Sequence, residues 1–105
     1  MKPQQIPHTN IGIPWTELCR ELDHAERKFP GWPADPIHGM AIVMEEAGEA
    51  QRATMHYVYE NGSLEELRKE LIQTAVMAIR FLAVAHGGKA RVSHHQVARD
   101  QRHLD

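Results

Sequence analysis

The sequence predicts an all-α protein, and three observations support this prediction. Apolar residues recur at spacings of three and four along three long stretches, which is the period of an amphipathic helix. Proline and glycine residues fall between these stretches, where helices begin and end. No stretch alternates apolar and polar residues as a half-buried strand does. With 105 residues the chain fits a single domain, residues 1–105, and we expect its core at about 29–86.

The first predicted helix covers residues 15–28. Five residues repeat at helical spacing along it: Trp15, Leu18, Leu22, Ala25 and Phe29. The segment 30–33 ends the run, because it contains two prolines and a glycine. Cys19 lies among these apolar residues, so we expect it to be a buried free thiol. As the single cysteine of the chain, it cannot form an internal disulfide.

The second predicted helix, residues 36–59, begins after Asp35. An aspartate side chain caps the first free N–H groups of a helix, and Pro36 takes the first helical position, which proline favours. Apolar residues then continue at helical spacing, among them Ile37, Met40, Ala41, Met44, Ala47 and Met55. The pattern therefore predicts a helix of more than six turns.

The third predicted helix, residues 64–86, follows a chain reversal at Asn61 and Gly62. Ser63 and Glu66 form a capping box at its start. A wide apolar face then extends to the end of the helix. Because the connection is short, this helix must pack antiparallel against the second one as a hairpin.

A hairpin with short flanking helices leaves much of the apolar face of helix 64–86 exposed. We therefore expect a homodimer or homotetramer in which a second copy completes a four-helix-bundle core. The C-terminal segment 89–105 is polar and rich in histidine. Weak apolar markers predict a short fourth helix at 89–103.

The composition excludes several classes of partner. A formal net charge of -2 and a pI near 6.4 leave no basic surface for a nucleic-acid polymer. No apolar run approaches the ~18 residues that a membrane span requires, so we expect no membrane association. The N-terminus lacks the apolar core of a signal peptide, which predicts a cytoplasmic protein.

Charged carboxylates interrupt both helices of the predicted hairpin. The first helix carries Glu45, Glu46 and Glu49, and on the second Glu70 shares a face with Gln73. If the two faces meet, their oxygens form a cage that suits Mg²⁺, with Mn²⁺ as a substitute, because such hard cations prefer oxygen ligands. A geometric difficulty is that an ideal hairpin offsets the two motifs by about 10 Å along the axis.

The acidic residues have three alternative interpretations: a zinc site, a di-iron site and a solvated helix face. Zinc is disfavoured because the lone cysteine has no cysteine partner and no histidines stand at zinc-ligand spacing. A di-iron site is disfavoured because it requires a Glu-x-x-His motif from each of two facing helices, and the sequence has this pattern once, at Glu21 and His24. Glutamates on a helix are often only a solvated face. Gly48 favours a different interpretation, in which another backbone or a ligand comes close to the helix there. Glycine inside a helix lowers its stability by about 1 kcal/mol relative to alanine, so its presence needs a reason.

The motifs resemble those of a known family. Glu-Glu-Ala-Gly-Glu at 45–49, followed by Lys-Glu-Leu-Ile-Gln at 69–73 and an apolar helix, is similar to the MazG-like all-α nucleoside triphosphate pyrophosphohydrolases. The resemblance covers about residues 29–85. It implies that an ExxE motif and an ExxD motif together bind Mg²⁺ and cleave a nucleotide between its α and β phosphates. Gln73 stands where the family usually has Asp.

The resemblance also implies roles for individual residues. Glu46, Glu49, Glu70 and Gln73 would be the metal ligands. A carboxylate of the 45–49 group, Glu45 included, would position or deprotonate the attacking water. The substrate would be a nucleoside or deoxynucleoside triphosphate, and the products a monophosphate and pyrophosphate. Residues proposed to contact the substrate are His38, Trp32, Lys69 and Arg80.

A second hypothesis keeps the helices and omits the chemistry. In it the chain is a non-catalytic helical dimer that acts as a regulatory or interaction module, and its acidic face is solvated.

Overall fold

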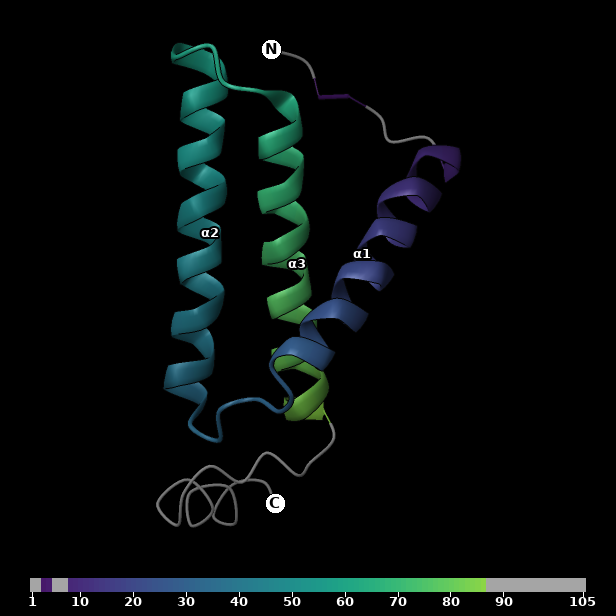
Figure 1. Ribbon diagram of the computed structural model, residues 1–105, viewed down its shortest axis with the longest axis vertical. Coiled ribbons are helices and arrows are strands. Elements are labelled where there is room, and N and C mark those ends of the chain that lie inside the picture. The colour runs from purple at the N-terminus through teal and green to yellow at the C-terminus, as the bar shows by residue number, and fades with distance from the viewer. Residues whose placement is uncertain (1–2, 5–7, 87–105) are drawn as a thin grey trace.

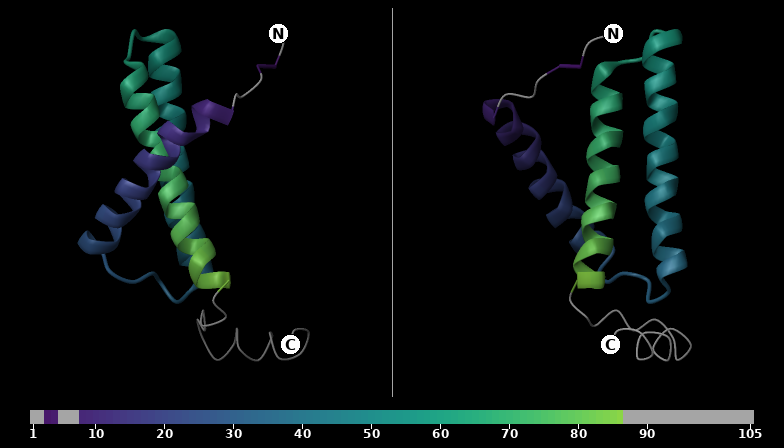
Figure 2. Two further views of the ribbon diagram at one scale, coloured as in Figure 1. Left: turned by 90° about the vertical axis from the view of Figure 1, so that its right-hand side faces the viewer. Right: turned by 180° about the vertical axis from the view of Figure 1, so that it is seen from behind.

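The computed structural model describes residues 3–4 and 8–86, which form three α-helices. They are α1 (His8–Lys28), α2 (Pro36–Tyr59) and α3 (Leu64–His86). α2 and α3 form an antiparallel hairpin, and α1 crosses α3 obliquely on the side away from α2 (Figures 1 and 2). No strand occurs in these residues, so the all-α prediction is confirmed. The helix predicted at 89–103 lies outside the described residues.

The bounds of α2 and α3 agree with the predicted ranges. Asp35 caps α2, because its carboxylate accepts a hydrogen bond of 3.0 Å from the backbone N–H of Ile37. Ser63 caps α3 by accepting a bond of 3.0 Å from the N–H of Glu66. At the reversal, a Cβ on Gly62 would lie 2.3 Å from the ring of His56, so only glycine fits there.

The predicted start of the first helix was wrong by seven residues, because α1 begins at His8 and not at residue 15. Pro14 lies inside the helix. A proline removes one backbone hydrogen bond, and here it did not mark the helix start. The hydroxyl of Thr16 donates 2.9 Å to the carbonyl of Gly12, one turn earlier. The expectation that Cys19 is buried was also wrong, because its thiol is exposed.

α3 is the central helix. Leu18 and Ala25 of α1 pack against Val76, which is fully buried. On the other side of α3, the α2 residues Ala50 and Ala53 are buried, and their small side chains let the two helices approach. Among the described residues, α1 and α2 do not pack against each other. In the described fold, α3 therefore packs against α1 on one side and against α2 on the other.

The connection between α1 and α2 is fastened to α3 by Arg80. This side chain is 4% exposed, and its Nε donates 2.6 Å to Glu26 of α1. Its Nη2 donates to two carbonyls of the connection, at Phe29 and, over 2.8 Å, at Gly31. The guanidinium also lies 5.3 Å from the ring of Trp32. Arg80 therefore fixes the path of the chain into α2.

Trp32 closes the lower end of the hairpin. Its ring stacks on Phe81 of α3 at a centroid distance of 5.9 Å. Its indole Nε1 is buried without a hydrogen-bond partner among the described residues and lies 2.7 Å from the position of a Cβ on Gly39. The glycine therefore makes room for the indole against α2.

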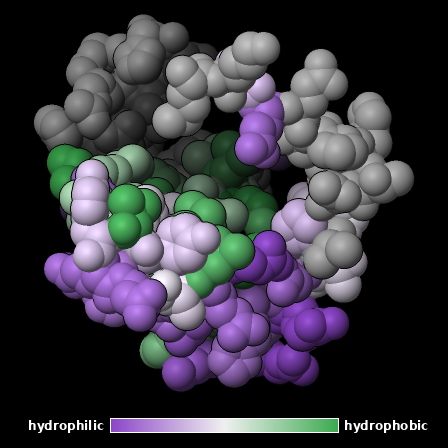
Figure 3. All heavy atoms as spheres, turned by 90° about the horizontal axis from the view of Figure 1, so that it is seen from above, coloured by the Kyte–Doolittle hydropathy of each residue, from purple (hydrophilic) through white to green (hydrophobic). Residues whose placement is uncertain are grey.

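Many large apolar side chains reach the surface. In the view from above, hydrophilic residues gather along the lower part of the surface, and hydrophobic residues lie toward the centre and left of the view (Figure 3). Twelve large hydrophobic side chains of the described residues are exposed, whereas only five apolar residues are buried. No described helix is both long enough and apolar enough to cross a membrane.

Candidate functional site

The candidate site is a groove between α2 and α3 near their connection. It is a cavity of about 480 Å³. Its walls come from both helices, and the lining residues are Glu49, Arg52, Ala53, His56, Ser63, Glu66 and Glu70. Carboxylates of the two motif helices therefore share one groove. The offset expected between the two motifs does not keep Glu49 and Glu70 apart, because both line this groove.

Electrostatic crowding marks the carboxylates of this groove. Partial burial raises the pKa of Glu46, and the charges of Glu45 and Glu49 raise it further. Burial likewise raises the pKa of Glu70, and the neighbouring Glu66, Glu46 and Glu49 raise it further because they favour its protonated form. Glutamates of α2 thus act on a glutamate of α3, which means that the two helices present like charges to each other.

Glu66 is the member of this group that sequence reasoning missed. Its predicted role was capping alone, and its backbone N–H does donate to the hydroxyl of Ser63. Its side chain, however, lines the groove beside Glu70 and contributes to the raised pKa of that residue. The available signal was the spacing, because residues four apart lie on the same face of a helix. The acidic pair of α3 is therefore Glu66 with Glu70.

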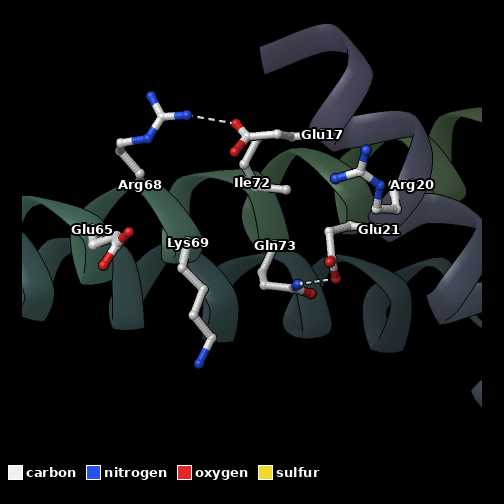
Figure 4. Close-up of a pocket in the computed structure, with 8 residues that line it drawn as sticks. All are labelled: Glu17, Arg20, Glu21, Glu65, Arg68, Lys69, Ile72 and Gln73. Carbon is white, nitrogen blue, oxygen red and sulfur yellow. Dashed lines mark hydrogen bonds and ion pairs between the residues drawn. The ribbon is translucent and has the colours of Figure 1, made fainter. Parts of the chain in front are cut away.

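Gln73 is not brought to the carboxylates of α2. It lies in a second groove, between α1 and α3, where its Nε2 donates 3.0 Å to Glu21 (Figure 4). The amide nitrogen must face Glu21, because an ionised carboxylate only accepts hydrogen bonds. Lys69 lines the same groove and extends away from the ion pair between Glu17 and Arg68. The predicted Glu70–Gln73 pair is thus divided between two sides of α3.

The remaining predicted residues lie in three places. Glu45 and His38 are exposed on α2, outside the residues that line the groove. Trp32 packs between Gly39 and Phe81 at the lower end of the hairpin. The side chain of Arg80 is buried and bonded to α1 and to the connection, as described above. The structure therefore gives Trp32 and Arg80 packing contacts rather than a place in the groove.

The groove has the ligand chemistry for a hard cation. Glu49, Glu66 and Glu70 line it from two facing helices, and Glu46, outside the lining, adds a carboxylate whose charge acts on Glu70. Carboxylate oxygens are ligands that Mg²⁺ accepts. Among the described residues, no three Asp, Glu, His or Cys side chains lie close enough to bind one ion as they are placed. Rotation of the glutamate side chains would be needed to bring their oxygens together.

Arg52 is the cation of this groove. Its Nη1 lies 2.7 Å from Oε1 of Glu49, one turn earlier on α2. Both side chains are largely exposed, and an exposed pair of this kind contributes at most about 1 kcal/mol. A divalent cation could therefore displace the guanidinium from Glu49.

No family model matches this chain. Neither a curated protein nor a solved structure matches it either. The functional interpretation therefore depends on the residues and geometry described above.

Proposed function

We propose that this protein is a Mg²⁺-dependent hydrolase of nucleoside or deoxynucleoside triphosphates in the cytoplasm. It cleaves between the α and β phosphates and releases a nucleoside monophosphate and pyrophosphate. The observation that supports this proposal best is the crowding of Glu46 and Glu49 of α2 with Glu66 and Glu70 of α3, which raises two glutamate pKa values. Like charges that disfavour the free protein are a favourable environment for a divalent cation.

The metal would be bound by Glu46, Glu49, Glu66 and Glu70, with Mn²⁺ able to replace Mg²⁺. When bound, a divalent cation neutralises and orients the phosphate oxygens. Gln73 is not included among the proposed ligands, because its amide is bonded to Glu21 on the other side of α3.

The protein's own residues supply proton transfer and charge. A carboxylate of the 45–49 group acts as the general base, and Glu45 is the candidate because Glu46 and Glu49 are proposed as metal ligands. The base takes one proton from a water whose oxygen attacks the α phosphorus. The bond from this phosphorus to the bridging oxygen breaks, and pyrophosphate leaves with the electron pair. Arg52 is placed to bind the departing phosphates, because it lines the same groove.

Assembly of identical chains is part of the proposal. A homodimer or homotetramer with a four-helix core would cover hydrophobic side chains that are exposed in the single chain. The rival function, a non-catalytic helical dimer, shares this feature. The carboxylate groove separates the two functions, because a solvated acidic face gives no reason for glutamates to oppose one another across two helices.

The test is an assay of pyrophosphate release. Purified protein is incubated with each common nucleoside and deoxynucleoside triphosphate, with Mg²⁺, with Mn²⁺ and with a chelator. The proposal predicts metal-dependent release of pyrophosphate and monophosphate from at least one triphosphate. If no triphosphate releases pyrophosphate and added metal does not raise the melting temperature, the enzyme hypothesis is wrong and the interaction module is favoured.

A further inference from the structure

The groove between α2 and α3 changes its charge along α2. Glu49 lines it on the side away from the connection, and Arg52 and His56 line it on the next two turns toward the connection. His56 lies four residues before Glu60, the residue that ends α2. A rise of 1.5 Å per residue places His56 about 10 Å beyond Glu49 along the helix axis. The groove therefore has an acidic end and, at the connection, an end with cationic side chains.

His56 is held in place by the connection. A Cβ on Gly62 would lie 2.3 Å from its Nδ1, so the ring packs directly against the backbone there. The carbonyl of His56 accepts hydrogen bonds from the N–H groups of Glu60, over 2.9 Å, and Gly62, over 2.8 Å. Its Nε2 lies 3.5 Å from Oε1 of Glu60, which is long for a hydrogen bond. Since the side chain is 56% exposed, this nitrogen is accessible to a ligand in the groove.

The start of α3 adds hydrogen-bond donors from the facing helix. Ser63 lines the groove, and its hydroxyl accepts from the N–H of Glu66 but still carries a proton to donate. The first N–H groups of a helix have no partner inside it, and the positive end of the helix dipole lies with them. Glu65, in the same turn, lines the groove on the α1 side of α3. Both helices therefore offer donors at the connection end.

We infer that this end of the groove binds the terminal phosphate of the nucleotide, and that His56 determines a preference for triphosphates over diphosphates. The inference rests on the proposed hydrolysis, which places the metal-bound phosphates beside Glu49 and Glu70. From there the phosphate chain extends past Arg52 to His56. N–H and O–H donors match phosphate oxygens, whereas carboxylates repel them unless a metal ion lies between. A diphosphate in the same register ends before it reaches His56.

The opposite orientation, with the nucleoside at the connection, is disfavoured by the lining of the groove. Of the described residues that line it, only Ala53 is apolar. A base binds against apolar or aromatic surface, and the connection end has no apolar wall of the size that a base requires. The nucleoside is therefore assigned to the opposite end of the phosphate chain.

The test is a comparison of binding that requires no turnover. The probes are αβ-methylene analogues of the common ribonucleoside and deoxyribonucleoside triphosphates, together with the matching diphosphate analogues. Each is titrated with Mg²⁺ into the full chain as wild type, His56→Gln and His56→Arg. His24→Gln is the matched control, because His24 is an exposed histidine of α1 outside the residues that line this groove.

The expected result is a preference that depends on residue 56. Wild type should bind a triphosphate analogue about tenfold or more tightly than its diphosphate counterpart. His56→Gln should lose most of this preference by weakening triphosphate binding alone, and His24→Gln should keep it. His56→Arg should keep it as well, because arginine retains a cationic donor at this position.

Three results would overturn the inference. They are equal binding of both analogues by wild type, an equal loss for both analogues in His56→Gln, and loss of the preference in His56→Gln and His56→Arg alike. The last would mean that residue 56 acts through the fold and not through its charge.

The outcomes also separate this inference from the proposed hydrolysis. A preference that depends on His56, without release of pyrophosphate from natural triphosphates, rejects the hydrolysis and keeps the phosphate subsite. Release of pyrophosphate without the preference rejects the subsite alone. If none of the analogues binds, both proposals fail.

Discussion

The two grooves that flank α3 differ in how their charges are balanced. On the α1 side, Glu17 pairs with Arg68 and Glu21 accepts from Gln73. On the α2 side, glutamates of both helices face one another, and the pKa values of Glu46 and Glu70 are raised. Balanced charge holds two helices together, whereas surplus like charge opposes folding. This difference is the reason why we propose the ligand site on the α2 side and expect the α1 side to contribute to stability.

The largest expected effect is on catalysis. Glu49→Gln should lower the rate of pyrophosphate release about 10³-fold or more, because it removes a charged metal ligand at nearly unchanged shape. The matched variant Glu21→Gln, in the other groove, should stay within a few-fold of wild type. Steady-state rates at saturating Mg²⁺ make the comparison. If Glu49→Gln instead unfolds the protein, as judged by circular dichroism, the residue is structural and the contrast between the grooves fails.

The next effect is on folding and concerns the α1 side. Arg80→Ala should lower the free energy of unfolding by about 2–4 kcal/mol, because it leaves two carbonyls and Glu26 without their buried partner. Arg27→Ala is the control, since Arg27 forms an exposed pair with Asp23 and should cost less than about 1 kcal/mol. Urea unfolding at fixed protein concentration measures both. Equal losses of unfolding free energy in the two variants would show that the buried contacts of Arg80 stabilise the fold no more than an exposed ion pair does.

The pH dependence of stability is a smaller effect and concerns the α2 side. Burial, and after it the neighbouring carboxylates, raise the pKa of Glu46 and Glu70, so the folded chain binds these protons more tightly than the unfolded chain. Their contribution to stability is fully present below the unfolded pKa, near 4.5, and is lost as the pH rises through the raised values.

Melting curves in a chelator, from acidic to neutral pH, check this expectation. With rising pH, the melting temperature should fall less steeply in Glu46→Gln than in wild type. The substitution removes one titrating carboxylate and also removes a like charge that acts on Glu70. Glu21→Gln should keep the wild-type slope, since it leaves the α2–α3 carboxylates in place. A slope identical in all three proteins would mean that these carboxylates do not oppose one another in the folded chain.

The smallest effect comes from Gln73→Asp, which introduces the residue found at this position in the family that the motifs resemble. Gln73→Asp should leave activity within about twofold, because the new carboxylate faces Glu21 and not the groove. It should cost stability by about 1 kcal/mol, since a hydrogen bond is replaced by repulsion. A several-fold gain in metal affinity or rate would instead show that residue 73 reaches the metal. Activity and melting temperature of the variant decide between these outcomes.

The bounds of α2 and α3 were predictable because local chemistry fixes them. Asp35, Ser63 and Gly62 act within one turn of the residues they cap or reverse, so their effects can be read without tertiary structure. The start of α1 was not predictable in this way. Pro14 normally suggests a helix start, and here it lies inside the helix.

The gathering of glutamates on the hairpin was predictable from the sequence, whereas the set of residues that lines the groove was predictable only in part. Spacing alone put Glu46, Glu49 and Glu70 on the hairpin, but it could not say which neighbour of Glu70 turns toward α2. That choice depends on where α1 packs, because Glu21 of α1 binds Gln73 and Glu66 is left as the partner of Glu70. Trp32 and Arg80 were misplaced for the same reason, since their contacts join segments distant in sequence.

The most direct test of the central claim is a calorimetric titration of Mn²⁺ into three proteins without nucleotide. These are wild type, Glu66→Gln and Gln73→Ala, which alter the two sides of α3 one at a time. We predict saturable binding to wild type, affinity lower by about tenfold or more in Glu66→Gln, and unchanged affinity in Gln73→Ala. Absence of binding to wild type, or a loss in Gln73→Ala with none in Glu66→Gln, would contradict the assignment of the metal to the α2–α3 groove.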